Sequence, residues 1–117
     1  MANRVSGRKL GRETGPRMAL YKNLTVAILR YEQVKTTEAR AKEVRGRVER
    51  MITLAKDGSL TARRRVVAEL PDEPLVIDKL FKEIAPRYAD RTSGYTRLVR
   101  IGLRSGDAAP IVQIELV

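Results

Sequence analysis

The stretch that decides the fold is 95–117, in which 95–104 read Tyr-Thr-Arg-Leu-Val-Arg-Ile-Gly-Leu-Arg, 105–110 read Ser-Gly-Asp-Ala-Ala-Pro, and 111–117 read Ile-Val-Gln-Ile-Glu-Leu-Val. Two runs rich in β-branched residues on either side of a cluster of turn formers predict a β-hairpin. Successive side chains of a strand point to opposite faces of the sheet, so the first run should have one apolar and one cationic face. The expected apolar face has Val99, Ile101 and Leu103, and the expected cationic face has Arg100 and Arg104.

The second run has the matching pattern, because Val112, Ile114 and Leu116 alternate with Gln113 and Glu115. A two-stranded hairpin alone is only marginally stable in water. We therefore expect the residues that precede it to cover its apolar face.

Those residues predict helices and one short strand. A first helix should run over 16–31, and a strand over 33–36 should add to the hairpin. A long helix should follow a Thr37 cap and end at Gly58. Its apolar stripe has the helical period and consists of Ala41, Val44, Val48, Met51, Ile52 and Ala55.

Two shorter helices should follow the long one. Ser59 should begin the first of them and Pro71 should close it, and Pro74 should open a second that stops at Pro86. Its expected core positions are Leu75, Leu80, Phe81 and Ile84.

The element order is therefore α-β-α-α-α-β-β, which predicts an α+β fold. We expect a two-layer α/β arrangement with the helices on one face of a small, about three-stranded sheet. Residues 16–117 should form a single domain. Residues 1–15 should form a basic N-terminal arm, without intrinsic structure, that RNA orders.

Charge and composition point to a polyanionic partner. The chain has 24 Lys and Arg against 14 Asp and Glu, a formal net charge of +10. It contains neither histidine nor cysteine, the commonest general base and zinc ligands, so neither a metal site nor a cofactor is expected. Asp90, Asp107 and Glu115 are the carboxylates near the basic hairpin, and Asp107 is better explained as a turn residue. We therefore predict that the protein is not an enzyme.

The richest cationic segments are the arm and the first hairpin strand with its linker, and both are dominated by arginine, whose planar fork suits phosphate. The predicted RNA-binding residues are Arg4, Ser6, Arg8, Lys9, Arg12, Arg17, Arg87, Arg91, Tyr95, Arg97, Arg100 and Arg104. Tyr88 and Tyr95 have two interpretations, stacking on an unpaired base or packing in the core, of which packing is the commoner.

Several fragments, taken in order and spacing, resemble one known family. They are Arg4-x-Ser6-Gly7-Arg8-x-Leu10, Ile52-Thr53-Leu54-Ala55-Lys56, Gly94-Tyr95-Thr96-Arg97 and Arg104-x-Gly106-Asp107-x-Ala109-Pro110, followed by Ile114-Glu115-Leu116. This combination resembles the bacterial large-subunit ribosomal protein L17 family over essentially the whole chain. The resemblance implies a structural constituent of the large subunit that binds ribosomal RNA near the exit of the nascent-chain tunnel. It also implies neighbouring large-subunit proteins as partners and no catalytic activity.

The alternative function is an architectural DNA- or RNA-binding protein outside the ribosome. Such a protein should have a dimer surface or a recognition helix with polar base-reading residues, and the sequence has neither signal. We expect a cytoplasmic protein that binds no membrane and forms no homo-oligomer.

Overall fold

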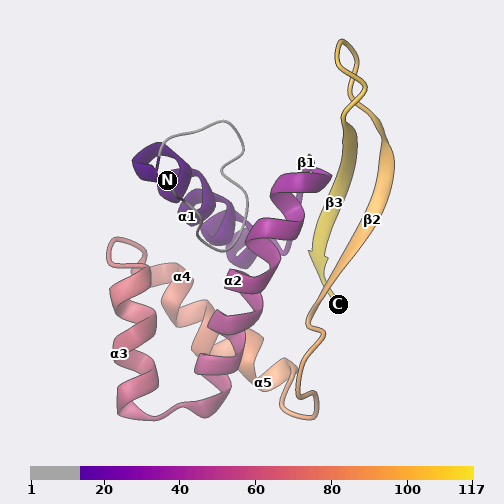
Figure 1. Ribbon diagram of the computed structural model, residues 1–117. Helices are drawn as coiled ribbons and strands as arrows, with labels where there is room; N and C mark the ends of the chain where they lie inside the picture. The colour runs from indigo at the N-terminus through magenta and orange to yellow at the C-terminus, as the bar shows by residue number, and fades with distance from the viewer. Residues whose placement is uncertain (1–13) are drawn as a thin grey trace, which may run out of the picture.

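A computed structural model describes residues 14–117, with side chains from Arg17 onward (Figure 1). The predictions made for residues 1–13 lie outside this part. The elements are α1 (Thr14–Tyr31), β1 (Gln33–Thr37), α2 (Glu38–Asp57), α3 (Leu60–Glu69), α4 (Pro74–Lys79), a π-helical segment η1 (Leu80–Ile84), α5 (Ala85–Arg87), β2 (Thr96–Leu103) and β3 (Pro110–Leu116). The helices lie on one side of the sheet, so the α+β fold class and the predicted order are confirmed.

The sheet has three antiparallel strands in the order β1-β3-β2. The short strand before α2 therefore pairs with the hairpin as predicted, with Val34 opposite Ile114. The predicted turn lies between β2 and β3, where Gly106 has a φ of 100°. Val112, Ile114 and Leu116 of the central strand are buried, which confirms the faces predicted for the second run.

The long helix α2 lies at the centre of the helical layer and contacts other helices and the sheet. The Thr37 hydroxyl accepts a hydrogen bond from the Arg40 amide at its start, and Gly58 ends it in the left-handed conformation with a φ of 69°. All six residues of the predicted stripe are buried. They pack against α1, α3, η1 and the central strand, so α2 is the element on which both layers meet.

The last helical segment begins at Pro74 as predicted, but it differs from the prediction in its first core position and in where it ends. Leu75 is 80% exposed, while Val76 and Ile77 take the buried positions that follow Pro74. The segment ends at Arg87, one residue after Pro86, and the hydrogen-bond ladder shifts by one residue before the proline, where the Ala85 amide bonds to the Leu80 carbonyl. A π-helical turn rotates the residues that follow it about the helix axis, and here it precedes Pro86, which has no amide proton to donate.

The first hairpin strand also differs from its prediction, because its faces are exchanged. Val99, Ile101 and Leu103 are 40%, 49% and 67% exposed. Thr96 is buried and Leu98 packs against the core instead. A β-bulge interrupts the register between Arg100 and Gly102, so the alternation predicted along the run is broken there.

Candidate nucleic-acid interface

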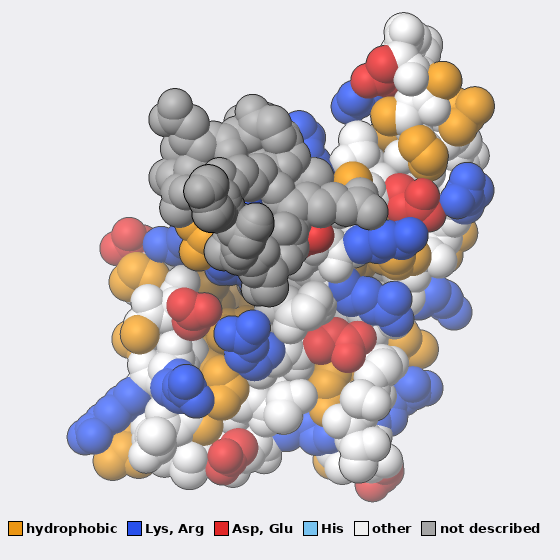
Figure 2. Space-filling model, viewed as in Figure 1, with side chains coloured by type: hydrophobic (Ala, Val, Ile, Leu, Met, Phe, Trp, Pro, Cys, Tyr) orange, Lys and Arg blue, Asp and Glu red, His pale blue; other side chains and the backbone are white. Residues whose placement is uncertain are grey.

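A row of charged side chains lies between the helical layer and the hairpin. Four residues of α2 are spaced by four, three and four positions, which places them on one helix face: Glu38, Lys42, Arg45 and Glu49. Thr96 and Arg100 of β2 meet this face. We call these six residues the α2–β2 seam. Figure 2 shows Lys and Arg side chains gathered between the helices and the hairpin.

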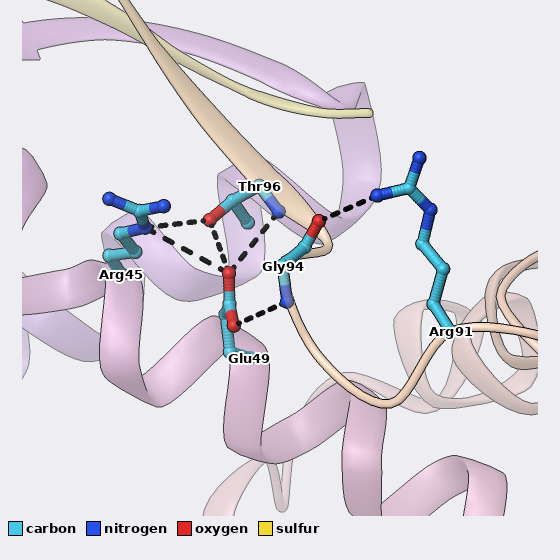
Figure 3. Close-up of polar contacts among 5 residues, drawn as sticks. All are labelled: Arg45, Glu49, Arg91, Gly94 and Thr96. Atoms are coloured by element: carbon cyan, nitrogen blue, oxygen red, sulfur yellow. Dashed lines mark hydrogen bonds and ion pairs between the residues drawn. The ribbon is translucent and has the colours of Figure 1, made fainter.

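Glu49 fixes one end of the seam (Figure 3). One carboxylate oxygen accepts a hydrogen bond from the Gly94 amide at 3.3 Å. The other accepts from the Thr96 amide at 3.3 Å and from the Thr96 hydroxyl at 2.8 Å. Arg45 Nε donates to the same hydroxyl at 3.2 Å and lies 3.8 Å from the carboxylate. The start of β2 is thus attached to the middle of α2 through one side chain.

Glu38 fixes the other end. Its Oε2 atom lies 3.0 Å from the Arg100 guanidinium and 3.9 Å from Lys42 Nζ, so two cations share one carboxylate oxygen. The side chains of Lys42, Arg45 and Arg100 remain 57%, 44% and 63% exposed. Exposed ion pairs of this kind contribute about 0–1 kcal/mol, so a phosphate can replace the carboxylate at little cost. The seam therefore presents arginine forks that are oriented but not buried.

The other predicted hairpin cations are paired along the hairpin itself. Arg97 Nε donates to Glu115 across the strands at 2.9 Å, and Arg104 binds Asp107 in the turn at 2.5 Å. The hydrogen bond from Arg104 lowers the pKa of Asp107 to about 2, and the one from Arg97 lowers the pKa of Glu115. Arg97 and Arg104 remain at the surface, with 59% and 46% of their side chains exposed.

The remaining predicted RNA-binding arginines, Arg17, Arg87 and Arg91, lie at separate positions on the fold. The Arg87 guanidinium binds both oxygens of Glu32, at 2.6 and 3.1 Å, and Arg91 donates to the Gly94 carbonyl at 3.2 Å. Arg17 is buried, with 8% of its surface exposed. The structure therefore does not gather Arg17, Arg87 and Arg91 with the hairpin arginines.

Of the two alternatives for Tyr88 and Tyr95, the structure supports packing in the core. Tyr88 and Tyr95 are 3% and 1% exposed, with ring centroids 5.3 Å apart. The Tyr95 hydroxyl donates to the Thr92 carbonyl at 2.9 Å and accepts from Lys56 Nζ at 3.0 Å. Because its ring faces are covered, Tyr95 has no free surface on which a base could stack, and we do not retain it as an RNA-binding residue.

Arg4, Ser6, Arg8, Lys9 and Arg12, the predicted residues of the arm, lie outside the part of the chain that the structure describes. Lys42 and Arg45 are not among the RNA-binding residues predicted from the sequence. The signal that identifies them is the spacing of Glu38, Lys42, Arg45 and Glu49 on one face.

Acid should weaken the fold through Glu32. The hydrogen bond from Arg87, with a second from Lys79, lowers the pKa of Glu32 from 4.5 to about 2, against the opposing effect of burial. The folded carboxylate therefore binds a proton less readily than the unfolded one, and its stabilising effect is present above pH 4.5 and lost as the pH falls towards 2. Urea unfolding at several pH values measures this loss.

The matched variant for this prediction is Glu32→Gln, which cannot ionise. Its free energy of unfolding should fall less steeply between pH 4.5 and 2 than that of the wild type. Parallel pH profiles for the two proteins would contradict the assignment of this ion pair.

Within residues 14–117, no three His, Cys, Asp or Glu side chains come together as a metal site. None of the helices in this range combines the length and apolar character that crossing a membrane requires.

Comparisons with known proteins agree on one family. The family model described as Ribosomal protein L17 matches residues 20–117. The large ribosomal subunit protein bL17 of Desulfitobacterium hafniense (strain DSM 10664 / DCB-2) is 56% identical over 110 residues, which are 94% of this chain and 97% of that protein. The bL17 protein of Caldanaerobacter subterraneus subsp. tengcongensis is 55% identical over 113 residues, 97% of this chain and all of that protein. That of Syntrophotalea carbinolica is 50% identical over all 117 residues and 75% of its own length.

Proposed function

The chain belongs to the ribosomal protein L17 family, and from this premise we propose that it is a structural constituent of the large ribosomal subunit that binds and stabilises ribosomal RNA. The family consists of ribosomal proteins and not of enzymes, which confirms the prediction of no catalytic activity and places the protein in the cytoplasmic ribosome. A position near the exit of the nascent-chain tunnel, next to other large-subunit proteins, is part of the proposal and is supported by the family resemblance alone.

One observation supports RNA binding by this chain in particular. Three cationic side chains from α2 and β2, each 44–63% exposed, meet around two glutamates in the α2–β2 seam. Two of them are arginines, which can form paired hydrogen bonds to a phosphate. A duplex or a folded loop of RNA presents successive phosphates that can bind along such a row.

The N-terminal residues extend the proposed interface. Arg4, Ser6, Arg8, Lys9 and Arg12 carry four positive charges, and Glu13 is the only acidic residue near them in the sequence. The arm was predicted over 1–15, but Thr14 and Gly15 belong to α1, so we propose that the residues that precede α1 bind ribosomal RNA as a basic arm. Arg97, Arg100 and Arg104 on the hairpin complete the proposed contact residues, with Arg100 shared with the seam.

Replacing Lys42, Arg45 and Arg100 together with alanine should weaken the binding of large-subunit RNA by roughly tenfold or more. If each side chain contacts one phosphate, the logarithmic salt slope should fall by about 0.7–0.9 for each. Solvent-exposed substitutions of this kind usually change stability by no more than about 0.5 kcal/mol each, so the variant should remain folded. Filter binding at several salt concentrations and thermal melting measure the two effects.

The control is the triple alanine variant of Arg63, Arg64 and Arg65, which removes the same charge from α3. That helix lies across α2 from the hairpin (Figure 1). We expect a smaller decrease in the salt slope for this variant. Equal decreases would mean that overall charge, and not the seam, determines the affinity.

A further inference from the structure

One aromatic side chain stands apart from the others because solvent reaches it. The four tyrosines and one phenylalanine of the chain all lie within the described residues, and the chain has no tryptophan. Tyr31, the last residue of α1, is 64% exposed. The other aromatic residues pack inside the protein: Tyr21, Tyr88 and Tyr95 are buried, and Phe81 is partly buried against the core. Burial is where an aromatic ring stabilises a fold, so the fold of this chain gives the Tyr31 ring no packing role.

The backbone on both sides of this ring is held by contacts with distant parts of the chain. The Arg30 carbonyl accepts a hydrogen bond from Lys79 Nζ at 2.7 Å. The Glu32 carbonyl accepts one from the Leu116 amide at 2.9 Å. The exposed ring of Tyr31 therefore projects from a fixed point between α1 and β1.

The residue that follows the ring has an unusual backbone. Glu32 has a φ of 67°, a left-handed conformation that residues other than glycine rarely adopt. Its carboxylate binds the Arg87 guanidinium at 2.6 and 3.1 Å and Lys79 Nζ at 3.1 Å, so ion pairs with two other elements accompany this conformation. Strained backbone of this kind occurs preferentially at binding sites, where it fixes the direction of neighbouring side chains.

Cations surround the same ring. The guanidinium carbon of Arg30 lies 5.9 Å from the ring centroid. Arg30, Lys79 and Arg87 supply three positive charges here, against two negative charges from Glu32 and Glu73. Arg30 pairs with Glu73 at 2.8 Å, but its side chain is 45% exposed. Because an exposed ion pair of this kind is weak, the Arg30 guanidinium can also contact a phosphate.

An exposed aromatic ring beside a cation has the chemistry that binds unpaired nucleotides. The ring stacks on the face of a base, and the cation contacts the neighbouring phosphate. In a duplex the base faces are already stacked on each other, so the ligand must be a base in a loop, a bulge or a single strand. A protein partner would also cover the ring, but any apolar side chain at this position would then serve, which an experiment can distinguish.

We propose that Tyr31 stacks on an unpaired base of ribosomal RNA and that Arg30 contacts a phosphate beside this base. The inference rests on the proposed function, because it takes ribosomal RNA as the ligand. It adds a contact that depends on the local structure of the RNA, whereas the α2–β2 seam depends on its charge.

Binding of purified large-subunit RNA by the full chain tests the proposal. Tyr31→Ala should lower the affinity roughly tenfold and leave the logarithmic salt slope unchanged, because no charge is lost. Tyr31→Leu, which is apolar but has no ring, should lose as much, and Tyr31→Phe should keep the wild-type affinity. Arg30→Gln should lower the salt slope by about 0.7–0.9.

The control is Leu75→Ala, which removes an even more exposed apolar side chain from α4 and should leave the affinity unchanged. Thermal melting should differ little among these variants, because the changed positions are exposed. Full affinity in Tyr31→Ala would overturn the proposal. Full affinity in Tyr31→Leu would also overturn it, because an apolar contact and not stacking would then explain the binding.

Tyr31→Trp provides a direct second measurement, because it places a single tryptophan in a chain that has none. Stacking on a base should quench the fluorescence of this tryptophan when ribosomal RNA is added and should shield it from acrylamide. The tryptophan of Leu75→Trp should show neither change. Equal changes at both positions, or a tryptophan at position 31 that acrylamide still reaches in the complex, would refute stacking. Failure of the wild-type protein to bind ribosomal RNA would refute the proposed function itself, so the two failures are distinct.

Discussion

Replacing Ile114 with alanine should lower the free energy of unfolding by about 3–4 kcal/mol, within the usual range for truncating a buried isoleucine. Ile114 is fully buried at the centre of the middle strand, with Val34 opposite it on β1 and Leu98 opposite it on β2. Truncation removes apolar contacts with both neighbouring strands and with the helical layer at once. A loss of this size is a large part of the stability of a domain of this length. Urea unfolding monitored by circular dichroism measures it.

Ile101→Ala is the matched control, because it removes the same atoms from the same sheet. Ile101 is 49% exposed beside the bulge, so its truncation should change stability by no more than about 0.5 kcal/mol. Similar losses for the two variants would mean that the distal hairpin packs against another part of this chain. The sequence alone predicts equal effects, so the pair also tests which face of β2 meets the helices.

The exchanged faces of β2 have a specific cause. Leu98 and Val99 are adjacent apolar residues, so the run supports either of two alternations. The alternating residues Val99, Ile101 and Leu103 favoured the alternation that buries Val99 and exposes Leu98. The choice actually depends on how far α2 extends beneath the strand and on the bulge after Arg100, and neither has a signal within the strand. A periodicity shows which side chains share a face and not which face is covered.

Other parts of the fold were predictable because their signals are local. The Thr37 cap, the stripe of α2 and the left-handed Gly58 follow from helix geometry within a few residues. The π-helical segment Leu80–Ile84 illustrates the limit, since no local signal predicts the shift in the hydrogen-bond ladder that precedes Pro86. The exposure of Leu75 likewise depends on which side of the six-residue helix α4 meets α1.

The sequence predicted the class of ligand that the candidate interface binds, but not where on the fold the interface lies. Net charge and arginine content indicate a phosphate ligand wherever the cations lie. Which cations are available depends on partners distant in the sequence, such as Glu38 for Arg100 and Glu32 for Arg87. Tyr95 is not retained as an RNA-binding residue for the same reason, because Thr53 and Lys56, which contact its hydroxyl, come from the distant helix α2.

Replacing Glu49 with alanine should lower the free energy of unfolding by about 2–3 kcal/mol, because leaving one buried donor unsatisfied costs about 1–3 kcal/mol. Glu49 accepts from the backbone amides of Gly94 and Thr96, and Thr96 is only 4% exposed. The lost carboxylate also held the Thr96 hydroxyl and oriented Arg45. Alanine favours a helix at least as well as glutamate does, so the loss cannot come from the helix itself.

Glu43→Ala, at a position six residues earlier on α2, controls for the change of residue type and should alter stability by no more than about 0.5 kcal/mol. Glu49→Gln keeps the length of the side chain but replaces one acceptor oxygen with a donor that faces the amides, so it should recover only part of the loss. Because Glu49 attaches β2 to α2, amide exchange at Gly94 and Thr96 should accelerate in both Glu49 variants beyond the change in global stability. Exchange that follows global unfolding alone would mean that other contacts hold the start of β2 on the helix. In that case Arg45 would keep its orientation without the carboxylate, and the phosphate affinity of the seam would be independent of Glu49.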